Sequence, residues 1–323
     1  MGITDDAWTE YWATGALHSC AGSFQGDYGG EIGGFWARVF HGLGDGDRVL
    51  DLCCGNGALG RLLAAREGFA GSGVAMDAVD AAAVAPGWLD TLPPPERARF
   101  RFHPGVDAGR LPFEDGAFDL CASQYGIEYA GPPAWDEARR VLSPGGRFAA
   151  VVHHAGSLPV RIAREEVAHL DWLQAPGGPL EAAGTLAPFM AMAAAPGGVE
   201  RLNRDPDAIR ARDAFRRAMQ ALEERAAGAR YPDVLDEAAQ PLAGALQAAR
   251  QRGAAAAADG LRDASSAWAL QHRRAAALVE VAMDREQLLG LAARISPAVP
   301  EPGELRFGNG EVAGWSIELR REG

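Results

Sequence analysis

One short segment constrains this chain more than any other feature: an apolar run that leads directly into a glycine-rich turn. Residues 48–52 read Arg-Val-Leu-Asp-Leu, and Cys53-Cys54-Gly55-Asn56-Gly57 follows before a helix-like stretch. Glycine is needed where the backbone turns sharply and approaches a ligand closely. A strand, a glycine turn and a helix in this order predict a binding site for a nucleotide-like cofactor, NAD included.

The chain around this turn alternates strand-like and helix-like segments. Turn signals such as Pro144-Gly145-Gly146 separate them. Such alternation predicts a parallel sheet with helices on both faces. Near the end of the chain, Gly308-Asn309-Gly310 lies between two strand-like runs, which predicts an antiparallel hairpin. The expected fold class is therefore α/β, a doubly wound, mostly parallel, seven-stranded sheet with strands at 48–52, 70–76, 100–103, 118–123, 147–153, 305–307 and 315–319.

The composition changes after residue 158, where alanine, arginine, glutamate and leucine dominate and strand signals fade. Asp205 before Pro206 is a favourable helix start, and Gly228 is a favourable stop. We interpret the alanine run at 254–258 as helix rather than linker, because alanine has the highest helix propensity. The expected helices cover 160–174, 181–194, 206–228, 233–252 and 260–294.

Four parts follow from this pattern. Residues 1–45 are an N-terminal helical and aromatic cover, and residues 46–157 are the cofactor-binding core. Residues 158–298 are a helical insertion between the fifth and sixth strands, serving as a lid or a dimer interface, and residues 299–323 form the terminal hairpin.

Charge and composition exclude several classes of protein. The formal net charge is −12 and the chain contains no lysine, which excludes a Walker A phosphate loop and a lysine Schiff base. An acidic surface repels phosphate backbones, so we expect no nucleic-acid partner. The four cysteines show no CxxC spacing, so neither zinc nor disulfides are expected and a cytoplasmic location fits. The absence of a signal-like start or a long apolar run predicts no membrane association.

Two further stretches narrow the cofactor. Residues 106–120 (Val-Asp-Ala-Gly-Arg-Leu-Pro-Phe-Glu-Asp-Gly-Ala-Phe-Asp-Leu) resemble the third and fourth motifs of class I S-adenosylmethionine-dependent methyltransferases of the UbiE, or methyltransferase type 11, kind. Residues 140–147 (Arg-Val-Leu-Ser-Pro-Gly-Gly-Arg) resemble the segment before their fifth strand. The resemblance covers residues 46–154 closely and the terminal hairpin more loosely. It implies S-adenosyl-L-methionine as cofactor and S-adenosyl-L-homocysteine as product.

The resemblance also implies roles for individual residues. Asp51 would steady the glycine loop and the methionine amino group, while Gly55 and Gly57 would pass under the cofactor. Asp77, expected at the end of the second strand, would bind the ribose hydroxyls. Asp107 would accept from the adenine amino group with Ala108 nearby, and Ser123 would face the methionine portion. The rest of the expected cofactor site is Cys53, Asn56, Ala78 and Gln124.

Three positions do not follow the family pattern in a simple way: Cys53, Asp107 and Asp119. The family usually has glycine where Cys53 stands, so the loop is expected to differ locally. For Asp107 and Asp119 the alternative is turn or cap chemistry. That alternative weighs as much as a functional role for Asp119, whereas a ligand role is favoured for Asp107.

The substrate side is expected where the fourth and fifth strands end. The candidate catalytic residues there are Tyr125, Glu128, His153 and His154. Histidine titrates near neutrality and can deprotonate an acceptor, but successive residues of a strand point to opposite faces, so at most one histidine is expected to reach the pocket. A metal site is not expected.

The N-terminal segment is expected either to enter the pocket or to form a surface loop. Its candidates for the pocket are His18 and Cys20. Candidates for the pocket lining are Trp12, Phe24, Phe189 and Trp268, with core packing as the alternative for each.

The sequence therefore predicts a methyltransferase acting on oxygen, nitrogen or carbon of a small molecule, possibly in specialised metabolism. Because the sulfonium already activates the methyl group, the protein mainly aligns the reactants. A tRNA or protein methyltransferase is one alternative. A non-catalytic S-adenosylmethionine-binding protein that forms a homodimer through its helical insertion is another.

Overall fold

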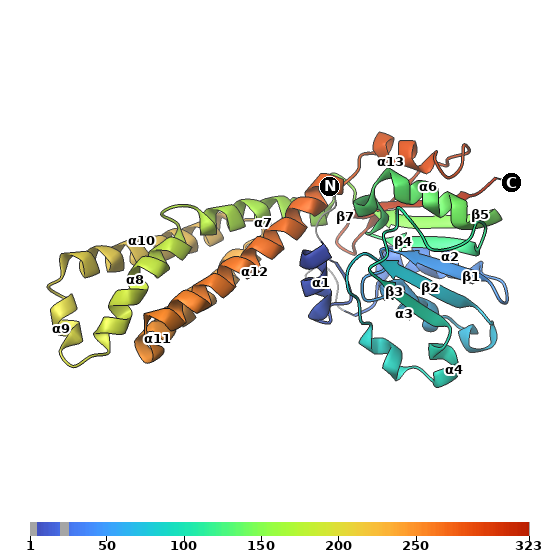
Figure 1. Cartoon of the computed structure of the whole chain (residues 1–323). Helices are drawn as coiled ribbons and strands as arrows, with labels where there is room; N and C mark the ends of the chain where they lie inside the picture. The colour runs from blue at the N-terminus through green and yellow to red at the C-terminus, as the bar shows by residue number, and fades with distance from the viewer. Residues whose placement is uncertain (1–4, 20–25, 323) are drawn as a thin grey trace. The chain divides into compact units, whose positions relative to one another are not determined.

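The computed structural model describes residues 5–19 and 26–322. The chain divides into two compact units. One unit contains the chain up to Arg161 and from Ala277 onward, and the other contains Ile162–Ala276. The first unit is a sheet flanked by helices, and the second is built from helices alone (Figure 1).

The sheet of the first unit has the strand order β3-β2-β1-β4-β5-β7-β6. The first five strands in this order are parallel, while β7 runs antiparallel to both of its neighbours. The predicted fold class is confirmed, including the hairpin of β6 and β7. The strands are β1 (Arg48–Leu52), β2 (Ala75–Asp80), β3 (Phe100–Pro104), β4 (Phe118–Gln124), β5 (Leu142–Val152), β6 (Gly303–Arg306) and β7 (Val312–Arg320).

Helices cover both faces of this sheet, and each face has its own apolar core. Along β4, Leu120 and Ala122 belong to the core under α2 and α3, whereas Cys121 belongs to the core under α6 and α13. This alternation is the two-residue period of a strand buried on both sides. The helices of this unit are α1 (Asp5–Ala13), α2 (Gly30–His41), α3 (Ala58–Ala64), α4 (Pro94–Arg97), α5 (Ile127–Ala130), α6 (Pro132–Val141) and α13 (Arg285–Ala292), with short 3₁₀ turns η2 (Phe69–Gly71) and η3 (Gly87–Thr91).

The expected position of the second strand is wrong. Residues Phe69–Gly71 form a 3₁₀ turn, and the strand begins only at Ala75. Gly73 takes a positive φ of 67°, which ends the turn before the strand starts. The strand then continues through Asp77 to Asp80, because the Asp77 carboxylate is paired inside the sheet with Arg48 and His103.

The second unit is a group of packed helices. Its core consists of small and branched apolar side chains, among them Leu170, Leu186, Leu242 and Leu261. Asp205 caps α10 by accepting from the backbone N–H groups of Asp207 and Ala208, so the predicted helix start is confirmed. The helices are α7 (Leu158–Gln174), α8 (Pro179–Ala193), α9 (Gly198–Leu202), α10 (Pro206–Gly228), α11 (Asp233–Arg252) and α12 (Ala254–Val281).

The single helix expected over 260–294 is two helices. α12 ends at Val281, and α13 starts after Asp284, whose side chain forms a capping box with Gln287. Between them, the Met283 backbone N–H donates to the His153 carbonyl. The backbone there is held by the end of β5, which interrupts the helix. The alanine run 254–258 is helical, as predicted.

No helix within residues 5–19 and 26–322 combines the length and the apolarity of a membrane-spanning segment.

Candidate functional site

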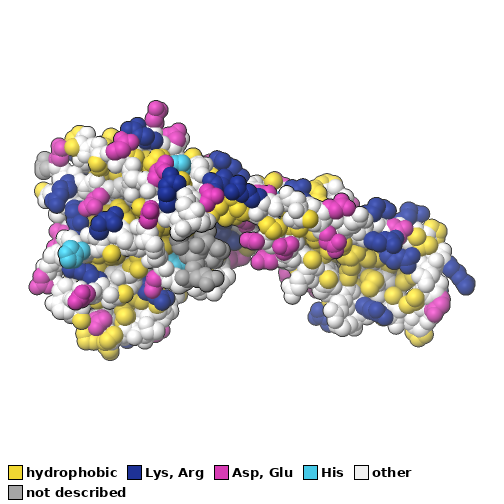
Figure 2. Space-filling model, turned by 180° about the vertical axis from the view of Figure 1, so that it is seen from behind, with side chains coloured by type: hydrophobic (Ala, Val, Ile, Leu, Met, Phe, Trp, Pro, Cys, Tyr) yellow, Lys and Arg dark blue, Asp and Glu magenta, His cyan; other side chains and the backbone are white. Residues whose placement is uncertain are grey.

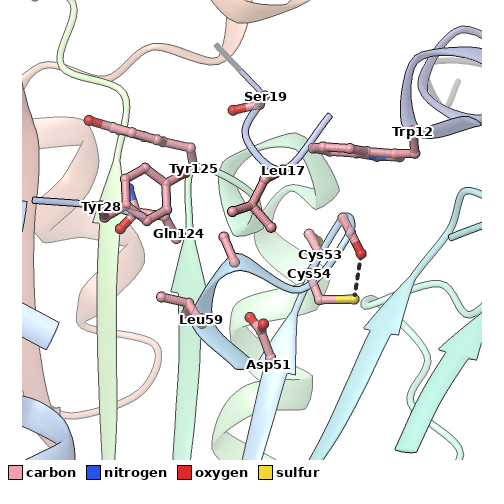
Figure 3. Close-up of a pocket in the computed structure, with 12 residues that line it drawn as sticks. Trp12, Leu17, Ser19, Tyr28, Asp51, Cys53, Cys54, Leu59, Gln124 and Tyr125 are labelled. Carbon is pink, nitrogen blue, oxygen red and sulfur yellow. Dashed lines mark hydrogen bonds between the residues drawn. The ribbon is translucent and has the colours of Figure 1, made fainter. Parts of the chain in front are cut away.

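A pocket open to solvent lies where β1 and β4 end and their loops begin. Figure 3 shows Asp51 below it, with Trp12, Leu17 and Ser19 on the opposite side. Ligands of open α/β sheets bind at the carboxyl ends of the strands, and this pocket has that position. The lining residues are Trp12, Leu17, Ser19, Tyr28, Asp51, Cys53, Cys54, Gly55, Ala58, Leu59, Gln124 and Tyr125.

Asp51 places a carboxylate in this pocket. Its side chain is 1% exposed, and its Oδ2 atom has no hydrogen-bond partner among the described residues. Burial, and to a lesser degree the nearby Asp80 carboxylate, raises the pKa of Asp51 well above its usual range. The raised pKa means that burying the charged carboxylate costs free energy. A cationic group in the pocket would offset this cost by supplying a positive charge and a hydrogen-bond donor.

The turn after β1 is held in left-handed conformations. Cys53, Gly55 and Gly57 have φ values of 56°, 51° and 77°. A side chain at Gly55 would collide with the Trp12 ring, and one at Gly57 with the Phe102 ring. Gly57 therefore serves the packing of the loop, since it is not among the residues that line the pocket.

Cys53 occupies a conformation that favours glycine, which agrees with its departure from the family pattern. A side chain at Gly126 would lie 2.6 Å from the Cys53 Cβ atom. The bulk at Cys53 is thus accommodated because the facing residue is a glycine. Burial raises the pKa of the Cys53 thiol, so this cysteine is not an activated nucleophile.

The acidic residue at the end of the second strand is Asp80, not Asp77. Asp77 lies in the middle of β2, where its oxygens pair with Arg48 at 3.1 Å and His103 at 2.8 Å. Asp80 ends the strand, and its Oδ2 accepts the Gly55 N–H at 2.8 Å. The apolar Val79 continues the strand past Asp77, and this signal in the sequence identifies Asp80.

Two further expected cofactor residues have structural roles. Asn56 is buried, and its amide donates to the carbonyls of Trp12 and Ala16 at 2.9 and 2.8 Å. It fastens the N-terminal segment to the loop rather than lining the pocket. Ala78 is fully buried inside β2, because that strand extends further than expected.

Asp107 forms a turn through its side chain. Its Oδ1 accepts the Gly109 N–H at 2.8 Å, and the residue is exposed. Ala108 is buried, and neither residue lines the pocket. Asp119 accepts the Arg48 N–H and the Ser143 hydroxyl, which is the cap chemistry considered as its alternative.

Ser123 and Gln124 divide the roles expected for the end of β4. The Ser123 hydroxyl is fully buried, donates to the Leu52 carbonyl and accepts the Ile127 N–H. It joins β1, β4 and α5, so the expectation that it faces the cofactor is wrong. Gln124 lines the pocket; its Oε1 accepts from Trp36, while its Nε2 has no partner among the described residues.

In Tyr125 and His154, the fold uses polar groups that were expected to act in catalysis. The Tyr125 ring lines the pocket, but its hydroxyl donates to the Ala313 carbonyl at 3.0 Å. His154 accepts the Gly156 N–H at Nδ1 and packs against the Trp315 ring. The His154 Nε2 atom lies 3.8 Å from Glu304, and the catalytic roles of both residues stay predictions.

Glu128 and His153 lie together next to Tyr125, and neither of them lines the pocket itself. The Glu128 Oε1 accepts the His153 backbone N–H at 2.9 Å. Burial raises the pKa of Glu128 to about 7 and lowers the pKa of His153 to about 3. At neutral pH, His153 is an uncharged imidazole and Glu128 is divided between its two protonation states.

Of the remaining residues expected to enter or line the pocket, only one of those that the structure describes is found in its wall. Trp12 lies in the pocket wall, and His18 is buried against the Tyr28 ring outside it. Phe189 and Trp268 pack in the apolar core of the helical unit. Cys20 and Phe24 lie outside the described residues. Within residues 5–19 and 26–322, no three His, Cys, Asp or Glu side chains gather as a metal site would require.

Sequence comparisons agree with this geometry. Residues 49–146 match the family model of a methyltransferase domain. The 2-phytyl-1,4-naphtoquinone methyltransferase of Synechocystis is 34% identical over 125 residues, which is 36% of this chain and 50% of that protein. Its counterpart in Synechococcus elongatus is 36% identical over 123 residues, which is 36% of this chain and 49% of that protein.

The chain spans about half the length of these curated relatives. Among solved structures, the YcgJ protein from Bacillus subtilis is 28% identical, with a TM-score of 0.33, and the match covers 45% of this chain and 58% of that one.

The glycine turn after β1 and the pocket at the strand ends lie within or beside the segment that these comparisons match. Residues 49–146 match a methyltransferase domain, which agrees with the resemblance seen in the sequence.

Proposed function

We propose that this protein transfers a methyl group from S-adenosyl-L-methionine to a small-molecule acceptor. The observation that carries the proposal is the pair of buried, unpartnered polar atoms in the pocket, Asp51 Oδ2 and Gln124 Nε2. A carboxylate and an amide donor suit the ammonium and carboxylate groups of a methionine portion. The bound cofactor supplies an activated methyl group.

Four of the lining residues and the neighbouring Asp80 have separate tasks in this proposal. Asp51 holds the ammonium group, and Gln124 donates to the carboxylate. Asp80 accepts the Gly55 N–H at Oδ2 and the Ala82 N–H at Oδ1, and as the acidic group at the end of β2 it takes the ribose role expected of Asp77. Trp12 and Leu17 exclude water from the reacting end of the pocket.

Calorimetry with S-adenosyl-L-methionine, S-adenosyl-L-homocysteine and NAD tests the cofactor. We expect binding of the first two and none of NAD. Asp80→Asn should weaken binding by about tenfold, as expected for the loss of one charged hydrogen bond, whereas Asp77→Asn should leave the affinity unchanged. Affinity for NAD alone would overturn the proposal.

A small-molecule acceptor is favoured because the matched relatives bear the name of a naphthoquinone methyltransferase and because the chain is acidic, with a net charge of −12. We propose no nucleic-acid partner and a cytoplasmic location. Methylation assays that compare tRNA with small aromatic acceptors test the first point, and exclusive turnover of tRNA would reverse it.

For residues 158–298 we propose a role as acceptor cover or dimer interface. Two observations support this proposal. Helix α7 begins six residues after β5 ends, and the segment is long enough to form its own apolar core. Figure 2 shows apolar side chains along the visible face of the helical unit. Within this segment, Met192 and Val199 are exposed. A monomer by sedimentation would leave only the covering role.

A further inference from the structure

A cluster of buried polar atoms beside the cofactor pocket remains unexplained by cofactor binding. Glu128 is 5% exposed and His153 is 0% exposed. The Glu128 Oε2 atom and both ring nitrogens of His153 have no hydrogen-bond partner among the described residues. The 2.9 Å bond from the His153 N–H to Glu128 Oε1 keeps the two residues adjacent.

Aromatic rings fix the imidazole and connect it to the pocket. The His153 ring stacks on Tyr125 with centroids 4.4 Å apart and an angle of 6° between the planes. The Tyr129 ring meets His153 edge-on at 6.0 Å. Since Tyr125 also lines the cofactor pocket, the His153 ring is separated from that pocket by one aromatic ring.

The aromatic contacts continue to the N-terminal helix. Trp8 lies edge-on to Tyr129 at 5.5 Å and stacks on Trp12 at 5.7 Å. Trp12 is part of the pocket wall. The polar cluster therefore borders an aromatic wall that begins and ends at pocket residues, a suitable surface for a planar apolar molecule.

The fold provides no charged partner that would account for this buried cluster. Ion pairing would account for a buried carboxylate, but the influences on the pKa of Glu128 are burial and backbone hydrogen bonds, with no cation among them. Several unsatisfied polar atoms in one place are costly, and proteins retain them mainly where a ligand completes the bonding.

We propose that Glu128 and His153 bind the methyl acceptor, with Glu128 Oε2 accepting the proton of an acceptor hydroxyl or amine. For a hydroxyl, the O–H bond breaks, its proton moves to the carboxylate, and the electron pair left on oxygen would form the bond to the methyl group as the S–CH3 bond breaks and S-adenosyl-L-homocysteine leaves. For an amine, the nitrogen lone pair would form that bond, and the carboxylate takes the proton from the resulting ammonium group. The His153 imidazole is a positioning group that can donate to that oxygen or nitrogen or accept from it. This inference rests on the proposed function and adds an acceptor class: a planar, largely apolar molecule with one hydroxyl or amine.

Matched probes test this assignment without turnover. We would saturate the protein with S-adenosyl-L-homocysteine and titrate in 1-naphthol, 1-naphthylamine or 1-methoxynaphthalene by calorimetry. The hydroxyl or the amine should bind about tenfold more tightly than the ether, which cannot donate a hydrogen bond. The preferred probe of the two identifies the acceptor group.

The preference should depend on the proposed residues. Glu128→Gln keeps the shape of the side chain but presents a donor at one terminal position, and it should reduce the preference to within about twofold. His153→Phe keeps the ring stacked on Tyr125 and should reduce it in part. The control is Asp136→Asn on α6, where the carboxylate forms an exposed ion pair with Arg294. This substitution should not change the preference among the probes.

Equal affinities for the three probes, or no binding of any probe at millimolar concentration, would overturn the acceptor site, while binding of S-adenosyl-L-homocysteine would leave the cofactor site intact. Failure of the wild type to bind S-adenosyl-L-homocysteine would instead overturn the proposed function. If Glu128→Gln fails to fold by circular dichroism, the His153→Phe result decides, and an unchanged preference there contradicts the assignment.

Discussion

The two units of this chain differ in where they place most of their polar side chains. In the sheet unit, Asp51, Glu128 and His153 are buried and Gln124 is half-buried near the carboxyl ends of the strands, and each has a buried atom without a partner among the described residues. In the helical unit, many charged side chains form exposed pairs three residues apart on one helix, as in Arg210–Asp207 and Arg262–Asp259.

This difference separates binding from stability. Burying an unpaired polar atom costs free energy, so the sheet unit gives up stability at the positions proposed to meet ligands. The helical unit gives up less, because its core is mostly apolar and many of its charged side chains remain in water, although His169 Nε2 and the Tyr231 hydroxyl are also buried without a hydrogen-bond partner among the described residues. Substitutions in the two units should therefore have different consequences.

The largest effect should come from the helical core. Leu242 is fully buried there, and Leu242→Ala should lower the free energy of unfolding by about 2–5 kcal/mol through lost burial and a residual cavity. The affinity for S-adenosyl-L-homocysteine should not change, since every described residue of the pocket belongs to the sheet unit. Denaturant unfolding and calorimetry measure the two quantities. A weakened affinity would show that the units are energetically coupled.

Asp51→Asn should have the reverse pattern. Removing the charge should weaken cofactor binding by about 1.5–3 kcal/mol, because a charged hydrogen bond to the ammonium group is lost. Stability at neutral pH should be equal or higher, because the raised pKa of Asp51 means that its buried charge is unfavourable in the ligand-free fold. Gln124→Glu offers a matched test at the other orphan atom, where an added carboxylate should repel the cofactor carboxylate. If Asp51→Asn lowered the stability but not the affinity for the cofactor, the proposed separation of binding from stability would be contradicted.

The sequence predicts much of the architecture because local patterns determine it. The glycine turn, the five parallel strands and the cap at Asp205 follow from short-range periodicity and capping chemistry. The end of β2 could not be placed in the same way. Asp77 looks like a strand end until Arg48 and His103, distant in sequence, are seen to neutralise it inside the sheet.

The candidate site shows the same limit. Asp51, Cys53, Gly55 and Gln124 line the pocket from positions that the motif specifies. The hydroxyls of Ser123 and Tyr125, however, are used by hydrogen bonds to other strands. Only the folded chain shows which polar groups remain without partners, because those bonds join residues far apart in sequence.

Glu128 gives a smaller, pH-dependent effect. Its pKa is about 7 in the fold and about 4.3 in an unfolded chain, so the folded state binds more protons between these values. Stability from this group is present below about pH 4 and is lost as the pH rises toward 7. Buried His153, with a pKa of about 3, acts in the opposite direction as the pH falls below about 6.5, so the wild type alone does not isolate either group.

The difference between wild type and Glu128→Gln isolates the carboxyl. Between pH 5 and 7 the wild type should lose stability relative to the variant, by a difference on the order of 1 kcal/mol. Urea unfolding at several pH values measures this difference. A constant difference across the range would show that the Glu128 carboxyl titrates as if exposed.

The smallest effect should come from the exposed pair Arg210–Asp207 near the start of α10. Both side chains are 70% exposed, and pairs of this kind contribute about 0.3–0.5 kcal/mol. Asp207 also lies in the first turn, where its negative charge interacts favourably with the helix dipole. Asp207→Asn should therefore cost slightly more than Arg210→Gln, and both should cost less than about 1 kcal/mol. A double-mutant cycle separates the pair from the dipole. The cycle could give a coupling energy well above about 0.5 kcal/mol that falls with added salt. Exposed ion pairs would then stabilise the helical unit substantially, and the contrast drawn between the two units would not hold.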